Sequence, residues 1–167
     1  LNIVNIDVVG LGATGGLVGI FDGGSEGEIN NVSVTGTVQG NYSGTGGLVG
    51  RMESGTVTDS SSSVTVEAYS TLGGAVGLLD DGEVTRTYAE GNVGPLSESN
   101  SYRVGGLIGE MDAGSVTLCF ATGNATGSDD VGGFVGSLDG GSIAKAYARG
   151  DVTGVGTEAG PVGGFAG

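Results

Sequence analysis

Five acidic residues recur at matching positions of the chain, and they are the side chains best suited to chemistry. They are Asp22, Glu53, Asp80, Asp112 and Asp139. Carboxylate oxygens are ligands that Ca²⁺ prefers, so a ladder of these acids could hold calcium between its rungs. Each acid could instead cap its own turn by accepting hydrogen bonds from backbone N–H groups. The sequence has no D-x-D-x-D-G loop, so we expect turn capping and keep calcium as the lesser hypothesis.

Three aromatic residues, Tyr88, Phe120 and Tyr147, share another recurring position, which Ser33 and Ser61 occupy in earlier units. An exposed aromatic strip could bind sugar rings, which makes surface glycans a candidate partner. Alternatively, the rings stack on one face of a sheet and stabilise it by about 0.2–1 kcal/mol per pair. We favour the stacking interpretation.

The sequence gives little support to catalysis. Histidine is absent, and no P-loop lysine accompanies the glycine runs. The one cysteine, Cys119, shares its position with small residues, so we expect it to be buried as a small hydrophobic side chain. We therefore expect no enzyme activity, no catalytic residue and no cofactor.

Three N-x-Ser/Thr sequences are candidate glycosylation sites, at Asn31, Asn41 and Asn124. Asn41 is the strongest candidate because it precedes a glycine pair in an expected loop. Asn124 is expected to point outward, next to an inward-facing Ala125.

The charge balance excludes several partners. The formal net charge is −14, from 19 acidic and 5 basic residues, and the bases form no patch. Nucleic acids and anionic membrane surfaces would be repelled. The sequence has no apolar run of about 18 residues, so we expect no membrane insertion of this segment. An acidic, lysine-poor surface suits an extracellular or cell-surface location.

These residues must be positioned by a repeat. The sequence GGLVG begins at Gly15 and Gly46, and variants of it begin at Gly73, Gly105, Gly132 and Gly163, at intervals of 27 to 32 residues. Such a period is typical of stacked repeats. The segments between are short, rich in Val, Ile and Thr, and interrupted by glycine, which costs about 1 kcal/mol per residue inside a helix. We therefore predict an all-β chain without substantial helix: a parallel β-helix-like β-solenoid of about five coils with glycine-rich corners.

The expected coils are residues 15–45, 46–72, 73–104, 105–131 and 132–162. Residues 1–14 are expected to end a preceding, incomplete coil, and residues 163–167 to begin a sixth. We accordingly expect either a fragment of a longer array or chains that continue one another head to tail in a filament.

Three apolar positions should stack as columns through the coils. Large residues form the first: Phe21, Met52, Leu79, Met111 and Leu138. Branched residues form the second: Ile29, Val57, Val84, Val116 and Ile143. The third contains Val38, Val66, Val93, Ala125 and Val152. The neighbours Leu48 and Val49 leave two alternatives open, since strand alternation would send one outward. Either a bulge at the following glycine turns both inward, or an apolar stripe lies outside.

The repeated phrase resembles the GLUG repeat of bacterial and archaeal surface proteins, named for its Gly-Leu-x-Gly core. The core is matched best at residues 47–50 and 106–109, whereas Ala75, Phe134 and Phe165 replace the leucine. The resemblance implies a non-catalytic structural or adhesive segment of an exported surface protein or filament, whose partners are flanking repeats or other copies. The alternative is a carbohydrate-binding module, or an accessory segment of a secreted polysaccharide-active or peptidase enzyme.

Overall fold

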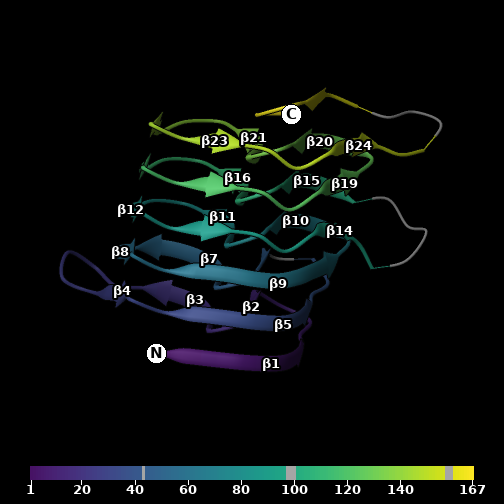
Figure 1. Ribbon diagram of the computed structural model, residues 1–167. Helices are drawn as coiled ribbons and strands as arrows, with labels where there is room; N and C mark the ends of the chain where they lie inside the picture. Colours follow the sequence, from purple (N-terminus) through teal and green to yellow (C-terminus); the bar gives the residue numbers. More distant parts are fainter. Residues whose placement is uncertain (43, 97–100, 157–159) are drawn as a thin grey trace.

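The computed structural model describes residues 1–42, 44–96, 101–156 and 160–167. These residues form strands and turns without any helix, and the chain winds around one axis as a parallel β-solenoid of about six turns (Figure 1). The predicted fold class is thus confirmed. No helix able to cross a bilayer occurs in this part of the chain.

Each complete coil contributes strands to four parallel sheets, which we label A to D. Sheet A contains β1 (Asn2–Val9), β5 (Ser33–Gln39), β9 (Ser61–Ala68), β13 (Tyr88–Ala89), β14 (Val93–Pro95), β18 (Phe120–Ala121), β19 (Ala125–Gly127), β23 (Tyr147–Ala148) and β24 (Val152–Gly154). Sheet B contains β2 (Thr14–Gly15), β6 (Thr45–Gly46), β10 (Ser70–Gly73), β15 (Tyr102–Gly105), β20 (Asp129–Gly132) and β25 (Val162–Gly163).

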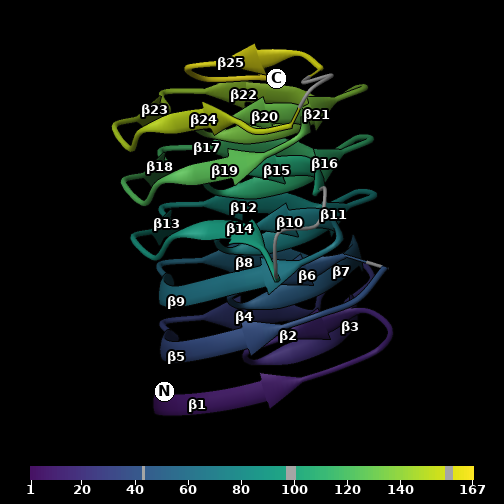
Figure 2. The ribbon, with the colours of Figure 1, turned by 90° about the vertical axis from the view of Figure 1, so that its right-hand side faces the viewer.

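Two shorter sheets complete the coil. Sheet C contains β3 (Val18–Asp22), β7 (Val49–Ser54), β11 (Val76–Leu79), β16 (Ile108–Met111) and β21 (Val135–Leu138). Sheet D contains β4 (Glu28–Asn30), β8 (Thr56–Thr58), β12 (Glu83–Thr85), β17 (Ser115–Thr117) and β22 (Ser142–Ala144). Figure 2 shows the coils stacked from β1 at one end to β25 at the other.

The three predicted apolar columns are confirmed by the strand register. Met52 pairs with Phe21 below it and Leu79 above it, and Val84 pairs with Val57 and Val116. The same register continues through the third column in sheet A. The middle coils bury these side chains completely, so the core is one continuous apolar rod inside the coils.

Leu48 and Val49 are both fully buried, so the outside stripe is not formed. The chain bends at residues 47–48, between β6 and β7, rather than at the glycine that follows the aliphatic pair. Leu48 therefore lies in the bend and Val49 begins β7, so strand alternation does not apply to the two and both side chains reach the core. The same arrangement recurs at Leu107 and Ile108.

The glycines of the repeated phrase are required by close approach, not by a left-handed backbone. A Cβ atom added to Gly46 would overlap the carbonyl oxygen of Val49 and lie 2.7 Å from the carbonyl oxygen of Ala75 in the next coil. The glycines with positive φ lie elsewhere. Five lie in the turn between sheets C and D, two lie between strands of sheets A and B, and one lies within β5: Gly24, Gly55, Gly82, Gly114 and Gly141; Gly44 and Gly156; and Gly36. Glycine therefore supplies positive φ in the turn between sheets C and D, and close approach between coils in the repeated phrase.

The corner between sheets D and A corrects the expectation of glycine-rich corners. It uses left-handed residues in every complete coil, and none is glycine. They are Asn31, Asp59, Arg86, Leu118 and Lys145, with φ between 48° and 59°. The first four of these residues donate their backbone N–H groups to carbonyl oxygens of the coil above. Leu118, for example, donates to Ala144 O at 3.2 Å. Stacking thus imposes a conformation that Leu, Arg and Lys disfavour.

Candidate binding groove and surface ladders

The acidic residues lie where β7, β11, β16 and β21 end, but they do not form a uniform ladder. A register shift after Phe21 sets Asp22 against Ser54 instead of Glu53, and Ser54 Oγ donates to Asp22 Oδ1 at 2.6 Å. The shift coincides with the long turn that follows it in the first coil, at residues 23–27. Asp22 therefore leaves the predicted column.

Arginine compensates the lower rungs. Arg51 Nε lies 2.6 Å from Asp80 Oδ2 in the next coil and 3.6 Å from Glu53 Oε1. The hydrogen bond to Asp80 raises the pKa of Arg51. Turn capping, predicted for Asp80, is found one residue later: Gly82 N–H donates to Asp81 Oδ1 at 2.8 Å.

At the upper rungs, Asp112 and Asp139 meet Glu110, a residue outside the predicted column. Ligand oxygens of the three lie within 4.8 Å of one another. Burial raises the pKa of Glu110, the nearby Asp112 and Asp139 raise it further, and Arg103, 3.4 Å away, opposes the shift. The sequence missed Glu110 because its position varies from coil to coil. Calcium binding stays a prediction.

The predicted aromatic stacking is confirmed on sheet A. The rings of Tyr88 and Phe120 lie 4.7 Å apart at 4°, and those of Phe120 and Tyr147 lie 5.1 Å apart at 3°. The guanidinium of Arg149 lies 5.2 Å from the centroid of the Tyr147 ring. The ring faces that point toward the neighbouring coils are therefore covered by the next ring, and a sugar ring cannot stack on these faces.

Cys119 is buried as predicted, and burial raises the pKa of its thiol. The thiol lies 3.3 Å from the carbonyl oxygen of Thr117, which suits a structural role. A raised pKa keeps the group protonated and unreactive.

The three glycosylation candidates lie in different settings. Asn124 is exposed, and its Oδ1 accepts a hydrogen bond from Asp151 N–H at 2.9 Å. Asn31 is exposed at the left-handed corner. Asn41 is half-buried, and the serine of its sequon, residue 43, lies outside the described residues. Glycosylation of each stays a prediction.

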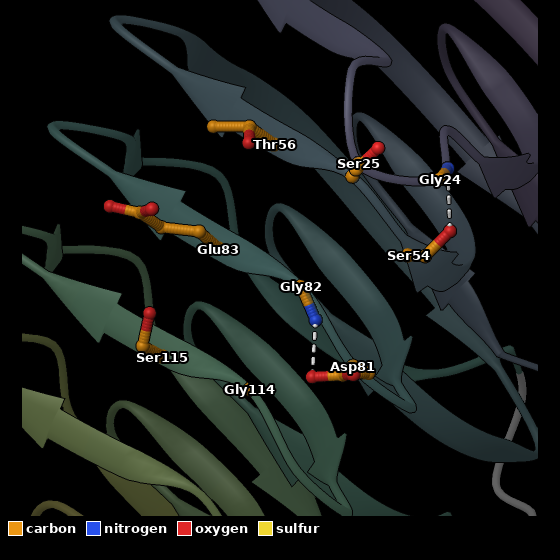
Figure 3. A pocket seen from close by; sticks show the side chains of 10 residues that line it. Gly24, Ser25, Ser54, Thr56, Asp81, Gly82, Glu83, Gly114 and Ser115 are labelled. Atoms are coloured by element: carbon orange, nitrogen blue, oxygen red, sulfur yellow. Dashed lines mark hydrogen bonds between the residues drawn. The ribbon is translucent and has the colours of Figure 1, made fainter.

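A groove with a volume of about 480 Å³ runs along the turn between sheets C and D (Figure 3). It spans four successive coils, from the β3–β4 turn to the start of β17. The lining residues are Gly24, Ser25, Ser54, Gly55, Thr56, Asp81, Gly82, Glu83, Gly114 and Ser115. Sequence reasoning missed this groove, although the glycine that recurs two residues before each branched aliphatic was a visible signal.

The floor of the groove is backbone. Gly55, Gly82 and Gly114 have φ values of 99°, 110° and 87°, a region that favours glycine. Their stacking is fixed by hydrogen bonds between coils: Glu83 N–H donates to Gly55 O, and Ser115 N–H to Gly82 O, each at 2.9 Å. The trough therefore has a floor without side chains.

Polar side chains form its two rims. Thr56, Glu83 and Ser115 follow one rim in consecutive coils, and Ser54 and Asp81 stand on the other (Figure 3). The β3–β4 turn closes one end, where Gly24 N–H donates to Ser54 Oγ at 2.8 Å. The arrangement offers hydroxyl and carboxylate groups at the spacing of the coils, about 4.8 Å.

The family model of the GLUG motif matches residues 41–67 and residues 127–153. Each match spans one coil, beginning ahead of the strand of sheet B and ending within the strand of sheet A. No curated protein and no solved structure matches the chain.

Proposed function

We propose that this chain, a GLUG-motif repeat protein, is a non-catalytic structural segment of a protein exported to the cell surface or of an extracellular filament. It acts as a spacer whose stacked coils present a continuous outer surface. The observation that carries the proposal is the unbroken register of the core columns, in which equivalent residues such as Met52, Leu79 and Met111 lie directly above one another.

The core supports a scaffold. Most inward positions of the middle coils are filled with packed apolar side chains. The raised pKa values of Arg51 and Glu110 are explained by an ion pair in the first case and by burial and neighbouring carboxylates in the second. Strand β1 pairs with β5 along one edge, and its other edge pairs with none of the described strands. A parallel strand edge accepts another strand. Flanking repeats or other copies of the chain are the partners that such an edge would take.

The acidic surface supports an exported location, because a net charge of −14 keeps a rod soluble and repels neighbouring copies from its sides. The test is an antibody raised against the folded chain and applied to the cells that make it. Labelling of intact cells, lost after brief protease treatment while a cytosolic marker survives, is the expected result. Labelling that appears only after lysis would contradict the proposal.

A second candidate function, carbohydrate binding, is favoured by one observation, the hydroxyl- and carboxylate-lined groove between sheets C and D. The aromatic ladder, by contrast, has its inner ring faces covered.

A further inference from the structure

We propose that the groove between sheets C and D binds a neutral polysaccharide strand laid along the solenoid axis. The proposal gives the second candidate function, carbohydrate binding, a ligand class, and its biological meaning rests on the surface location proposed above. The binding itself is a property of the folded chain.

The shape of the groove suits an extended polymer. The groove crosses four coils and is open along its length, while the turn at Gly24 and Ser25 walls one end (Figure 3). A Cβ at Gly82 would lie 2.6 Å from the carbonyl oxygen of Gly55, so only glycine keeps this floor flat. A ring without bulky substituents can therefore approach the backbone closely.

The rims supply the hydrogen-bonding groups that sugar hydroxyls require. Thr56 and Ser115 each offer a donor and acceptors, and the carboxylate of Glu83 between them is an acceptor for two hydroxyls. Hydrogen bonds to an ionised acceptor are roughly twice as strong as neutral ones. Glu83 is the residue we expect to contribute most.

The rims are also fixed before binding. Ser54 Oγ accepts from Gly24 N–H and donates to Asp22, and Asp81 accepts from Gly82 N–H. Glu83 Oε1 accepts from Thr85 Oγ1 at 2.8 Å. Side chains that are already oriented lose little conformational entropy when a ligand arrives.

The same lining argues against other ligand classes. The described lining residues include two carboxylates and no lysine or arginine, so a polyuronate, a sulfated glycan or a nucleic acid would be repelled. They include no aromatic or large apolar side chain, so a lipid or an apolar peptide would find no contact. A neutral, hydroxyl-rich chain fits these groups.

The test is affinity gel electrophoresis of the purified chain in gels containing a soluble β-glucan, an α-mannan or a galactomannan. Alginate serves as the anionic control. We compare the natural chain with Glu83→Gln and with Glu83→Gln combined with Thr56→Val. The matched control is Glu90→Gln, which removes the same charge from the outer face of the solenoid near Ser63.

We expect at least one neutral polysaccharide to retard the natural chain and the Glu90 variant equally. The dissociation constant should rise about tenfold or more in the double variant and by a smaller factor in Glu83→Gln, whose amide oxygen still accepts from Thr85. Circular dichroism checks the fold of each variant.

Absence of retardation by all three neutral polymers, equal retardation of every variant, or stronger binding to alginate would each overturn the proposal. The measurement uses purified components. A failure here therefore removes the groove's role without touching the surface location, and a failed cell-labelling experiment leaves this result standing.

Discussion

The backbone N–H groups of Leu48 and Val49 both donate to one acceptor, the carbonyl oxygen of Ala75 in the next coil, at 2.9 and 3.0 Å. The same shared acceptor recurs at Ala75 and Val76, which donate to Leu107 O. Two consecutive N–H groups can aim at one carbonyl only where the chain turns sharply. The repeated phrase is therefore a corner, and its glycines clear the space around it.

Substitution of a phrase glycine should break this corner. In Gly46→Ala the new methyl would overlap the carbonyl oxygen of Val49, so backbone must move in two coils. We expect a loss of about 3 kcal/mol in the free energy of unfolding, a fall in melting temperature of roughly 6–12 °C. Thermal unfolding followed by circular dichroism measures it.

The matched control is Gly94→Ala, where the new methyl would lie 3.6 Å from Thr126, an ordinary contact. Here we expect a change of less than about 1 kcal/mol, in the stabilising direction if any. Equal losses at both glycines would show that composition, rather than the corner, governs stability.

The buried hydroxyl of Ser62 is expected to destabilise the fold. Ser62 Oγ is completely buried and has no hydrogen-bond partner among the residues that the structure describes. The equivalent residues in the coils above are Ala89, Ala121 and Ala148. Ser62→Ala should raise the free energy of unfolding by about 1–2 kcal/mol, measured by urea denaturation.

Ser101 provides the opposite case. It is equally buried, but its Oγ donates to Ala68 O at 2.9 Å. Ser101→Ala should lower the free energy of unfolding by about 1 kcal/mol. If both substitutions shifted stability in the same direction, hydrogen-bond satisfaction would not be the cause.

The period of the sequence was enough to predict the columns, because every coil repeats the apolar spacing that the core needs. Local chemistry was not enough elsewhere. Nothing about Leu118 suggests a left-handed residue; the conformation comes from its hydrogen bond to the coil above. Glu110 joins Asp112 and Asp139 through stacking that a varying position conceals. The groove likewise exists only once glycines of separate coils lie together.

The left-handed corner can be relaxed at Leu118. This side chain is 47% exposed, so its replacement costs little packing. Leu118→Asn places at φ 59° a residue that tolerates the conformation, as Asn31 does at the same corner. We expect a gain of about 1 kcal/mol in the free energy of unfolding. Leu118→Ala, which keeps a Cβ without the polar group, should give no gain; a gain there would show that removing the exposed leucine is what matters.

Acidification should first stabilise the protein. The pKa of Glu110 is raised in the folded state by burial and by its acidic neighbours, so its charged form opposes folding at neutral pH. As pH falls through the folded pKa of Glu110, the folded protein takes up the proton first and stability rises. The melting temperature should therefore increase as pH falls from neutrality towards the ordinary titration range of glutamate.

Asp59 acts in the opposite sense at lower pH. Its hydrogen bond from Arg86 lowers the pKa of Asp59, so the stability it contributes is lost as pH falls through that lowered value. Glu110→Gln should flatten the initial rise in melting temperature and leave the loss of stability at lower pH unchanged. A variant whose rise matches that of the natural chain would assign the effect to other carboxylates.

Whole coils should be removable. Deleting residues 73–131 would bring Leu138 over Met52 and Ile143 over Val57, the same pairings that Leu79 and Val84 now make. Because each coil contacts mainly its neighbours, the shortened chain should fold, with its melting temperature lowered but its transition still cooperative. Small-angle scattering should show a rod shorter by about 10 Å, two coil spacings. Deleting residues 73–138 instead also removes the phrase glycines and β21, so Met52 would lose the apolar residue above it, and this variant should be much less stable. If both deletions folded equally well, the in-register columns would not be what holds the solenoid together.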